Sequence, residues 1–391
     1  MIRQYRLRDY NFRLVLWLGT LSALGVLLVG SAEVSLQRKQ MLGVVSGMVL
    51  MIVISLIDFS WVLNFTRLMY VANLAMLAAV RFAGHSSHGA QRWITIGGLR
   101  FQPVELTKII IILFFAKFFM EHENDLNKFS VVLRALLLLA LPLILVYLQP
   151  DMKDTITITA VFAVMYYAAG LSYKYIGAVL IVVIPLVVIF MSIVIQPEQT
   201  LIKDYQRKRI MAFLYPDNEE YTDDTTQQNN SVIAIGSGML SGKGLNNSEV
   251  DSANKGNFIS EIETDFIFAV AGEELGFLGS VGIVILLLLI VLECLLISVR
   301  SKDLSGKVIC CGLAALVSLQ SFINIGVATR MLPNTGTPLP FVSYGITSIW
   351  TLFMGMGVVL NVGLQSKVRF VVPAERRRGM ERGDRRWAGR R

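Results

Sequence analysis

The sequence predicts an all-α protein that crosses a membrane with ten transmembrane helices, and three observations support this prediction. The chain has 391 residues, of which 54% are hydrophobic and 16% charged, against about 45–50% apolar and about 25% charged residues in a soluble domain. Its mean hydropathy is +0.60. The apolar residues form uninterrupted blocks of about 20, the length of helix that spans a hydrocarbon core of ~30 Å. A water-soluble core cannot absorb so much apolar sequence, so we expect a polytopic membrane protein.

Ten such blocks follow one another, and each is expected to form one transmembrane helix. They cover residues 14–31, 41–58, 62–82, 105–120, 130–148, 155–170, 175–195, 277–299, 307–331 and 346–366. The arginines before the first block also fit a cleavable signal peptide, but we favour an uncleaved first helix. An even number of spans places both termini on the same side of the membrane.

The distribution of Lys and Arg predicts which side that is. Segments that would then be cytoplasmic hold 22 of these residues, short outer segments hold 8, and the loop at 197–264 holds 6. Because cytoplasmic loops carry an excess of Lys and Arg, both termini are expected in the cytoplasm. The loop at 197–264 is then extracellular, since long loops cross the membrane regardless of their charge.

The chain divides into two regions on this pattern. Residues 1–366 are expected to form one membrane domain that includes the extracellular loop, and residues 367–391 form a cytoplasmic tail with ten basic and three acidic residues. The tail is too charged to pack and is expected to be disordered. It supplies most of the net charge of +8, so that charge gives no reason to expect nucleic-acid binding. The three cysteines lie in apolar blocks and predict no disulfide framework.

Charge is concentrated at the expected outer end of the block at 105–120. Arg92 and Arg100 precede this block, and Glu105 and Lys108 fall in its first turns. Because residues three apart share one helix face, Glu105 and Lys108 are expected to be neighbours. Two interpretations remain open: a salt bridge that neutralises both charges, or a cationic lining for the phosphate-bearing head of a lipid.

A second polar group lies in the turn Gln149–Asp154, between two apolar blocks. There the carboxylates Asp151 and Asp154 flank Lys153. Polar residues are expected wherever two spans are joined, so this turn by itself is weak evidence of a site.

The block that begins at Asp265 has the most specific acidic pattern. From 265 to 300 it would form 36 residues of helix, roughly 54 Å long and longer than the hydrocarbon core. Its first turns are therefore expected in the outer interface, with Asp265 at a helix start where the dipole favours the ionised form. Glu273 is expected to approach the cavity that Asp265 faces and to help bind substrate, whereas Glu274 should point about 180° away. The alternative is that these acidic residues only stabilise the helix end.

The stretch 331–345 contains three prolines and two glycines. It cannot form an ordinary spanning helix, yet it is apolar and lies between the last two blocks. Irregular backbone survives at membrane depth only where it is buried in protein or lines a cavity. We therefore expect a re-entrant segment before the last helix, with an ordinary surface loop as the alternative.

Two pieces of the extracellular loop are candidates for contact with a ligand. Residues 205–210 include Arg209, and the glycine-rich residues 234–244 include Lys243. Glycines let backbone approach a ligand closely, and Lys243 among them is suited to a phosphate. This is no nucleotide-binding P-loop, because glycine follows Lys243 and no strand is expected before it. The three histidines are too scattered for a metal site.

Several of these motifs, in this order, resemble the SEDS family of RodA, FtsW and SpoVE proteins. They are Gly89–Trp93 with Gln102–Lys108, Gln149–Asp151, Ala234–Gly238, Thr264–Gly276 and Pro338–Gly345. The resemblance runs from about residue 10 to 366 and implies a bacterial peptidoglycan glycosyltransferase with ten transmembrane helices. Such an enzyme polymerises lipid II at the outer face of the cytoplasmic membrane, beside a class B penicillin-binding protein.

The resemblance also implies roles for individual residues. Asp265 matches the essential carboxylate of the family. Glu105, Lys108 and Asp151 match polar positions that are implicated in the family, and Arg209 matches an arginine of its outer loop.

The sequence departs from the family pattern at some positions. After Asp151 the pattern continues Leu-Gly-Thr, whereas here Met152, Lys153 and Asp154 follow. Ile346 stands where the pattern has a glycine. These departures leave the role of Asp151 and the geometry of the re-entrant segment open.

The chemistry of glycan polymerisation matches the residue types at hand. A base must take a proton from the acceptor hydroxyl while a diphosphate leaves the donor. We expect Asp265 to be that base in an inverting transfer that makes a β-1,4 link, and Arg92, Lys108, Arg209 or Lys243 to hold the diphosphate. A divalent cation such as Mg²⁺ or Mn²⁺ could share this task, and the sequence leaves that cofactor open.

The alternative function is a lipid II flippase, which is a transporter. A transporter usually binds its substrate at the bilayer midplane between repeats, whereas these charges are expected at the outer mouth and no repeat is visible. Polymerisation is therefore favoured. Elongation, division and sporulation all remain open as its setting, as does the identity of the partner transpeptidase.

Overall fold

The structure is a computed structural model, which describes residues 9–83, 85–87, 90–96, 99–196, 202, 204–215, 222–246 and 259–367. Helices dominate this part of the chain, which confirms the predicted all-α class. They are α1 (Phe12–Ala32), α2 (Val34–Leu56), α3 (Phe59–Leu63), α4 (Thr66–Ala83), α5 (Pro103–Glu121), the 3₁₀ turn η2 (Glu123–Asp125), α6 (Phe129–Leu148), α7 (Met152–Ala169), α8 (Tyr173–Val194), α9 (Asp204–Leu214), α10 (Thr222–Ser237), α11 (Ile267–Arg300), α12 (Leu304–Ala328) and α13 (Ile346–Lys367). The strands are β1 (His85–Ser87), β2 (Ala90–Ile96) and β3 (Leu99–Phe101).

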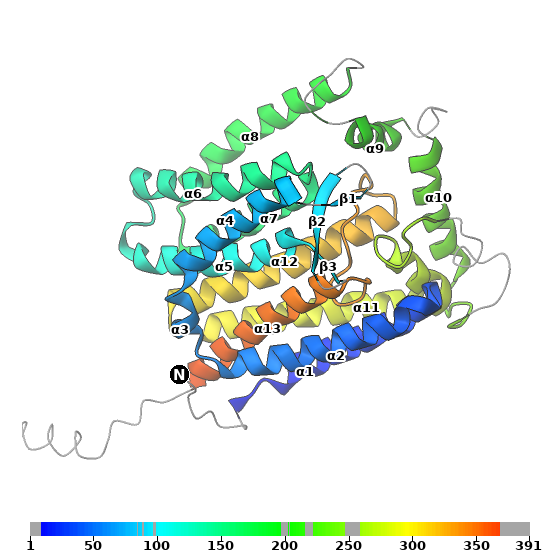
Figure 1. Ribbon diagram of the computed structural model, residues 1–391, viewed down its shortest axis with the longest axis horizontal. Coiled ribbons are helices and arrows are strands. Elements are labelled where there is room, and N and C mark those ends of the chain that lie inside the picture. The colour runs from blue at the N-terminus through cyan, green and yellow to red at the C-terminus, as the bar shows by residue number, and fades with distance from the viewer. Residues whose placement is uncertain are drawn as a thin grey trace, which may run out of the picture.

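The long helices run side by side through the body of the molecule (Figure 1). Each of the ten predicted apolar blocks overlaps one of them. Among the described residues, seven helices are long and apolar enough to cross a membrane: α1, α2, α6, α8, α11, α12 and α13. The chain is therefore a multi-pass membrane protein. Helix α4 has a shorter apolar stretch, and α5 and α7 carry buried charges, so the count of ten spans stays a prediction.

Small residues let the central helices approach one another closely. A Cβ atom at Gly47 of α2 would lie 2.5 Å from the ring of Phe353 in α13, and one at Gly357 of α13 would lie 2.7 Å from the carbonyl of Met51 in α2. In a membrane such close packing is a main source of attraction between helices. Of the seven candidate spans, α12 and α13 are the most enclosed, with 67% and 72% of their most apolar stretch buried.

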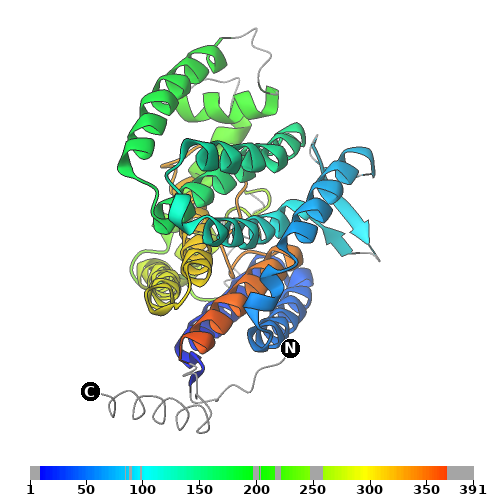
Figure 2. The same cartoon turned by 90° about the vertical axis from the view of Figure 1, so that its left-hand side faces the viewer.

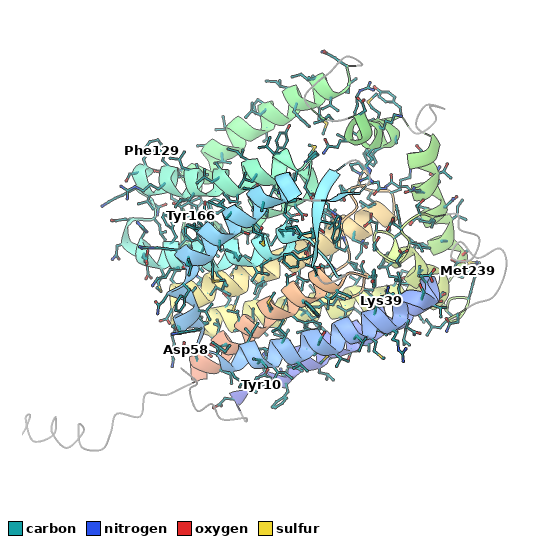
Figure 3. All side chains as sticks on the ribbon, in the orientation of Figure 1. Tyr10, Lys39, Asp58, Phe129, Tyr166 and Met239 are labelled. Atoms are coloured by element: carbon teal, nitrogen blue, oxygen red, sulfur yellow. The ribbon has the colours of Figure 1, made fainter. Side chains whose placement is uncertain are left out.

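Helix α8 lies apart from this packed body (Figures 1 and 2). None of the described side chains in its apolar stretch is buried, so those side chains are left for the acyl chains of lipid. Elsewhere side chains fill the space between the helices (Figure 3). Tyr166, for example, is 2% exposed, and its hydroxyl donates a hydrogen bond to the carbonyl of Leu126 at 2.8 Å.

A small antiparallel sheet joins α4 to α5, which the sequence did not predict. Its strand order is β1-β2-β3, with Ile94 of β2 opposite Phe101 of β3. Within β2, Ile94 and Ile96 flank Thr95, and this short alternation of apolar and polar residues suits a strand. The sheet places the chain so that α5 starts with Pro103 in its first turn, where a missing N–H costs nothing.

Helix α11 is interrupted, and the predicted unbroken helix from 265 to 300 is wrong. Gly276 has φ 66° and ψ −164° inside it, a backbone conformation that glycine adopts readily. A Cβ atom at this position would lie 2.3 Å from the backbone nitrogen of Gly242. The break therefore exists because a loop packs directly against the helix. The helix also begins at Ile267, so Asp265 lies in the preceding turn and not at a helix start.

Residues 329–345, between α12 and α13, have the buried, irregular backbone that the prolines and glycines predicted. Leu339, Phe341 and Val342 are each 1% exposed or less. The hydroxyl of Ser343 donates to the carbonyl of Thr264 at 2.6 Å and accepts from the amide of Leu339 at 2.7 Å. The part from Leu339 to Ser343 is thus enclosed by protein, as irregular backbone in a membrane protein must be.

The extracellular loop predicted at 197–264 contains α9 and α10, of which α10 lies at the end of the body where α11 begins (Figure 1). Gln228 of α10 donates to the carbonyls of Val327 and Leu332, and Ser231 donates to that of Ala328. The carbonyls of Val327 and Ala328 belong to the last turn of α12, where carbonyls lack a partner within the helix, and Leu332 lies in the irregular stretch that follows. The tail predicted at 367–391 lies outside the described residues apart from the last residue of α13.

Candidate active site

Asp265 lies where three segments of the chain meet. The amide of Asn324 in α12 donates to the carbonyl of Asp265 at 2.9 Å and to that of Thr337 at 2.8 Å. Asn324 is fully buried, so one side chain holds the turn before α11 against the irregular stretch. Asp265 itself is partly exposed, as a residue that meets a substrate must be.

Two cations from other elements, Lys153 and Arg209, lie near Asp265, and both are close to Gly336. A Cβ atom at Gly336 would lie 2.9 Å from Oδ2 of Asp265 and 3.7 Å from Nη1 of Arg209 in α9. Lys153, in the first turn of α7, donates from Nζ to the carbonyl of Gly336. Gly336 has φ +70°, a conformation that favours glycine. The site therefore combines one carboxylate, two cations and a closely packed backbone.

The surroundings of Asp265 change its acidity in two directions. Burial raises the pKa of the carboxyl above its ordinary value, Lys153 and Arg209 lower that pKa, and Glu261 raises it further. The net direction is upward, against the expectation that a helix dipole favours the ionised form. A carboxylate with a raised pKa is a stronger base, which suits it to accept a proton.

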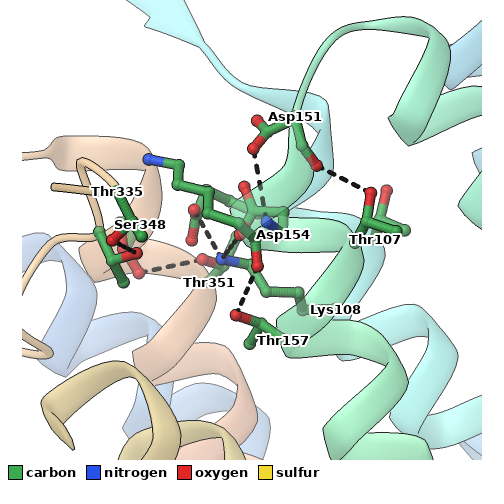
Figure 4. Close-up of polar contacts among 12 residues, drawn as sticks. Thr107, Lys108, Asp151, Asp154, Thr157, Thr335, Ser348 and Thr351 are labelled. Carbon is green, nitrogen blue, oxygen red and sulfur yellow. Dashed lines mark hydrogen bonds and ion pairs between the residues drawn. The ribbon is translucent and has the colours of Figure 1, made fainter. Parts of the chain in front are cut away.

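Lys108 forms a second cluster with two carboxylates (Figure 4). Its Nζ lies 2.7 Å from Oε1 of Glu105 and 3.1 Å from Oδ1 of Asp154, and all three residues are at most 5% exposed. The salt bridge interpretation of Glu105 and Lys108 thus describes the observed contact, with Asp154 as an additional partner. Asp151, 1% exposed, accepts from the amide of Asp154 at 3.4 Å and caps α7.

Lys243 is paired with Glu273. Its Nζ lies 2.9 Å from Oε1 of that residue, and its amide donates to the carbonyl of Glu273 at 3.0 Å. A Cβ atom at Gly238 would lie 1.9 Å from the carbonyl of Gly272, so this glycine is needed to pack the loop against α11. Glu274 is also buried and accepts from the hydroxyl of Ser31 in α1.

The side chain of Arg92 falls outside the described residues, although its backbone belongs to β2. No group of three or more His, Cys, Asp or Glu side chains within the described part of the chain is arranged to hold a metal ion.

Four residues of these clusters were missed by sequence reasoning: Lys153, Asp154, Asn324 and Gly336. The charges of Lys153 and Asp154 were visible, but a turn between spans explains charges without any site. Asn324 is an amide within an apolar block, and a polar residue in a span is a signal of function that would have found it. Gly336 stood among other turn-forming residues and had no distinguishing signal.

These clusters, at the ends of tightly packed apolar helices, define a multi-pass membrane protein with a polar site built around a carboxylate. The family model for FtsW, RodA and SpoVE, described as "Cell cycle protein", matches residues 11–368. The chain belongs to this family, as its motifs predicted.

Named relatives and solved structures cover most of the chain. It is 32% identical over 352 residues to the peptidoglycan glycosyltransferase MrdB of Escherichia coli, which covers 89% of this chain and 90% of MrdB. It is 33% identical over 295 residues to the probable peptidoglycan glycosyltransferase FtsW of Geobacter sulfurreducens, 75% of each chain. A solved structure described as "Structural coordination of polymerization and crosslinking by a peptidoglycan synthase complex" matches 92% of this chain and 99% of its own, with TM-score 0.77 and 26% identity. The rod shape determining protein RodA of Thermus thermophilus matches 92% of this chain and 98% of its own, with TM-score 0.66 and 25% identity.

Proposed function

We propose that the protein is a peptidoglycan glycosyltransferase that polymerises lipid II into glycan strands. Its relatives MrdB and FtsW carry that activity in their names. The observation that carries the proposal is the partly exposed Asp265 carboxylate, with its raised pKa and its two neighbouring cations.

Asp265 acts as the general base of this transfer. Its carboxylate accepts the proton of the acceptor's sugar hydroxyl while the hydroxyl oxygen bonds to the anomeric carbon of the donor. The bond from that carbon to the donor's phosphate oxygen breaks, and its electron pair leaves with undecaprenyl diphosphate. Attack opposite the leaving group inverts the anomeric centre, so an α-linked donor yields a β-1,4 glycan.

Arg209 is the cation of the extracellular loop best placed to meet the diphosphate, since its guanidinium lies beside Asp265. A guanidinium binds phosphate through paired hydrogen bonds. Arg92 is a further candidate for this task. A divalent cation such as Mg²⁺ or Mn²⁺ would supply additional positive charge for the leaving group.

The remaining candidate residues hold in position the segments around Asp265 and do not contact the substrate. Glu105 and Lys108 tie the start of α5 to α7, and Asp151 caps α7. Lys243 and Glu273 hold the glycine-rich loop against the break in α11. All five orient the segments that carry the reacting groups.

The protein works in a bacterial cytoplasmic membrane with both termini in the cytoplasm and the loop at 197–264 outside. This orientation places Asp265 on the outer face, where lipid II is polymerised. Its partner is a class B penicillin-binding protein, a transpeptidase that crosslinks the new strands. The likeness to a synthase complex that coordinates polymerisation and crosslinking supports this partnership.

The test is the variant Asp265→Asn, purified and given lipid II with Mg²⁺, with Mn²⁺ or with a chelator. Loss of a general base predicts a fall in initial rate of about 10²–10⁴-fold, measured as glycan ladders on a gel. Glu261→Gln is the matched control, because it removes one exposed carboxylate in the same turn. It should polymerise almost normally at neutral pH.

Normal ladders from Asp265→Asn at unchanged thermal stability would contradict the role of Asp265. The competing transporter function is checked with fluorescent lipid II in proteoliposomes. Translocation by the wild type without any polymer would favour a flippase and reject the glycosyltransferase.

A further inference from the structure

Lys153 and Asp154 are consecutive residues that face different partners. Neighbouring residues of a helix point about 100° apart. Asp154 is 2% exposed and pairs with Lys108, whereas Lys153 is half-buried and donates to the carbonyl of Gly336, which lies against Asp265. The first turn of α7 thus sends one charge into the helix bundle and the opposite charge to the candidate active site.

This arrangement gives the two clusters different net charges. The cluster of Lys108 combines one cation with the carboxylates of Glu105 and Asp154, and its sum is negative. The cluster of Asp265 combines the cations of Lys153 and Arg209 with the carboxylates of Asp265 and, in the same turn, Glu261, and these four charges sum to zero. Because charges interact most strongly where little water intervenes, the excess carboxylate of the first cluster repels an anionic group, whereas the second cluster has two cations to meet one.

The bonding of the two lysines points the same way. Lys108 is buried between two carboxylates, which neutralise its positive charge. In the part of the chain that the structure describes, Lys153 donates to a neutral carbonyl. An ammonium group has three N–H donors and Gly336 accepts from one of them, so Lys153 can offer its other donors to a ligand that comes to Asp265.

We propose that Lys153, with Arg209, binds the diphosphate of a lipid-linked substrate beside Asp265, and that Lys108 does not contact it. This inference rests on the proposed glycosyltransferase function. The ligand class is an isoprenoid diphosphate ester. The cations stabilise the negative charge that grows on the diphosphate as it leaves, while Asp265 takes the acceptor's proton.

Binding is measured on the full-length protein in nanodiscs of phosphatidylcholine, with farnesyl diphosphate as the soluble probe. Lys153→Met should weaken binding by about 10–100-fold, the effect of one hydrogen bond between charged groups. Lys153→Arg should bind more tightly than Lys153→Met because it keeps the charge. Lys39→Met is the matched control: Lys39 is an exposed lysine near the start of α2 (Figure 3), and its variant has the same change in net charge.

A purely structural role for Lys153 makes a different prediction. If Lys153 only holds the irregular stretch in place, Lys153→Met lowers thermal stability and affects farnesyl diphosphate and farnesyl monophosphate equally. Diphosphate binding instead predicts that the variant loses its preference for the diphosphate and has a raised KM for lipid II. Equal affinity of wild type and Lys153→Met, or equal loss in Lys39→Met, overturns the proposal.

Two further arms separate the sources of phosphate and the two proposals. Adding phosphatidylglycerol to the nanodiscs should leave the affinity for farnesyl diphosphate nearly unchanged; strong competition would assign the site to membrane headgroups and overturn the proposal. Asp265→Asn should bind the probe at least as tightly as wild type, because a like charge is removed, yet should not polymerise. Polymer from Asp265→Asn rejects the proposed function, whereas undiminished binding by Lys153→Met rejects only this inference.

Discussion

Replacing Gly336 by alanine tests whether the position of the Asp265 carboxylate limits the reaction. The new Cβ would lie 2.9 Å from Oδ2 of Asp265, whereas ordinary contact begins at 3.4 Å. The carboxylate is the end of a flexible side chain, so its retreat by about 0.5 Å relieves the contact cheaply. Since a misplacement of 1 Å can cost about 100-fold in rate, we expect kcat to fall about tenfold. The assay is the initial rate of glycan formation at saturating lipid II.

Two other glycines separate this effect from backbone strain. Gly170 has φ +113° with nothing within 4 Å of a Cβ, and Gly282 also has open space there without a positive φ. Gly336→Ala and Gly170→Ala should both lose about 1–2 kcal/mol of stability, the cost of a positive φ for alanine, and Gly282→Ala should lose little. Only Gly336→Ala should lose activity. If its kcat equals that of Gly170→Ala, the placement of the carboxylate does not control the rate.

The remaining predictions concern acidity and buried charge. A base is inactive once protonated, and the pKa of Asp265 is raised above 3.8, so the rate should fall with decreasing pH at a midpoint above that value. Lys153 lowers the pKa of Asp265, so the midpoint of the pH–rate profile should move up in Lys153→Met. Glu261 raises that pKa, so the midpoint should move down in Glu261→Gln. Shifts of the reverse sign would refute the assignment of Asp265 as the base. Lys108→Met strands two buried carboxylates and should cost about 3–5 kcal/mol of unfolding free energy. Lys117→Met, on the same helix but partly exposed, should cost less than about 1 kcal/mol, and similar melting temperatures for the two variants would count against a buried ion cluster.

Most of the helices were predictable because each depends on a local property. A block of about 20 apolar residues is stable in a bilayer when its backbone bonds to itself, and no distant partner is needed for that. The break at Gly276 was not predictable, since it depends on the loop at Gly242 that packs against it. The three strands were missed for a related reason: short strands are stable only when they pair with each other.

The candidate site was predicted in part. Asp265 was identified through its motif, and the contact between Glu105 and Lys108 followed from their spacing of three residues. The position of Asp265 before the helix start, with a raised pKa, was not foreseen. Its acidity depends on enclosure by other segments, which spacing along the chain does not reveal.

The sequence by itself determined that this protein is embedded in a membrane, where most of its spanning helices lie, and which carboxylate to suspect. The length of an apolar segment and the spacing of neighbouring residues depend only on residues that are close together in the chain. The interactions that they predict extend over no more than a few turns of helix. Only the tertiary structure decided that Lys108 is neutralised by carboxylates, whereas Lys153 lies beside Asp265 and donates to a neutral carbonyl. Asp154 reaches Lys108 across 46 residues of chain, and Lys153 reaches Gly336 across 183. Such pairs form only when the helices have packed, because charges interact through space and not along the chain.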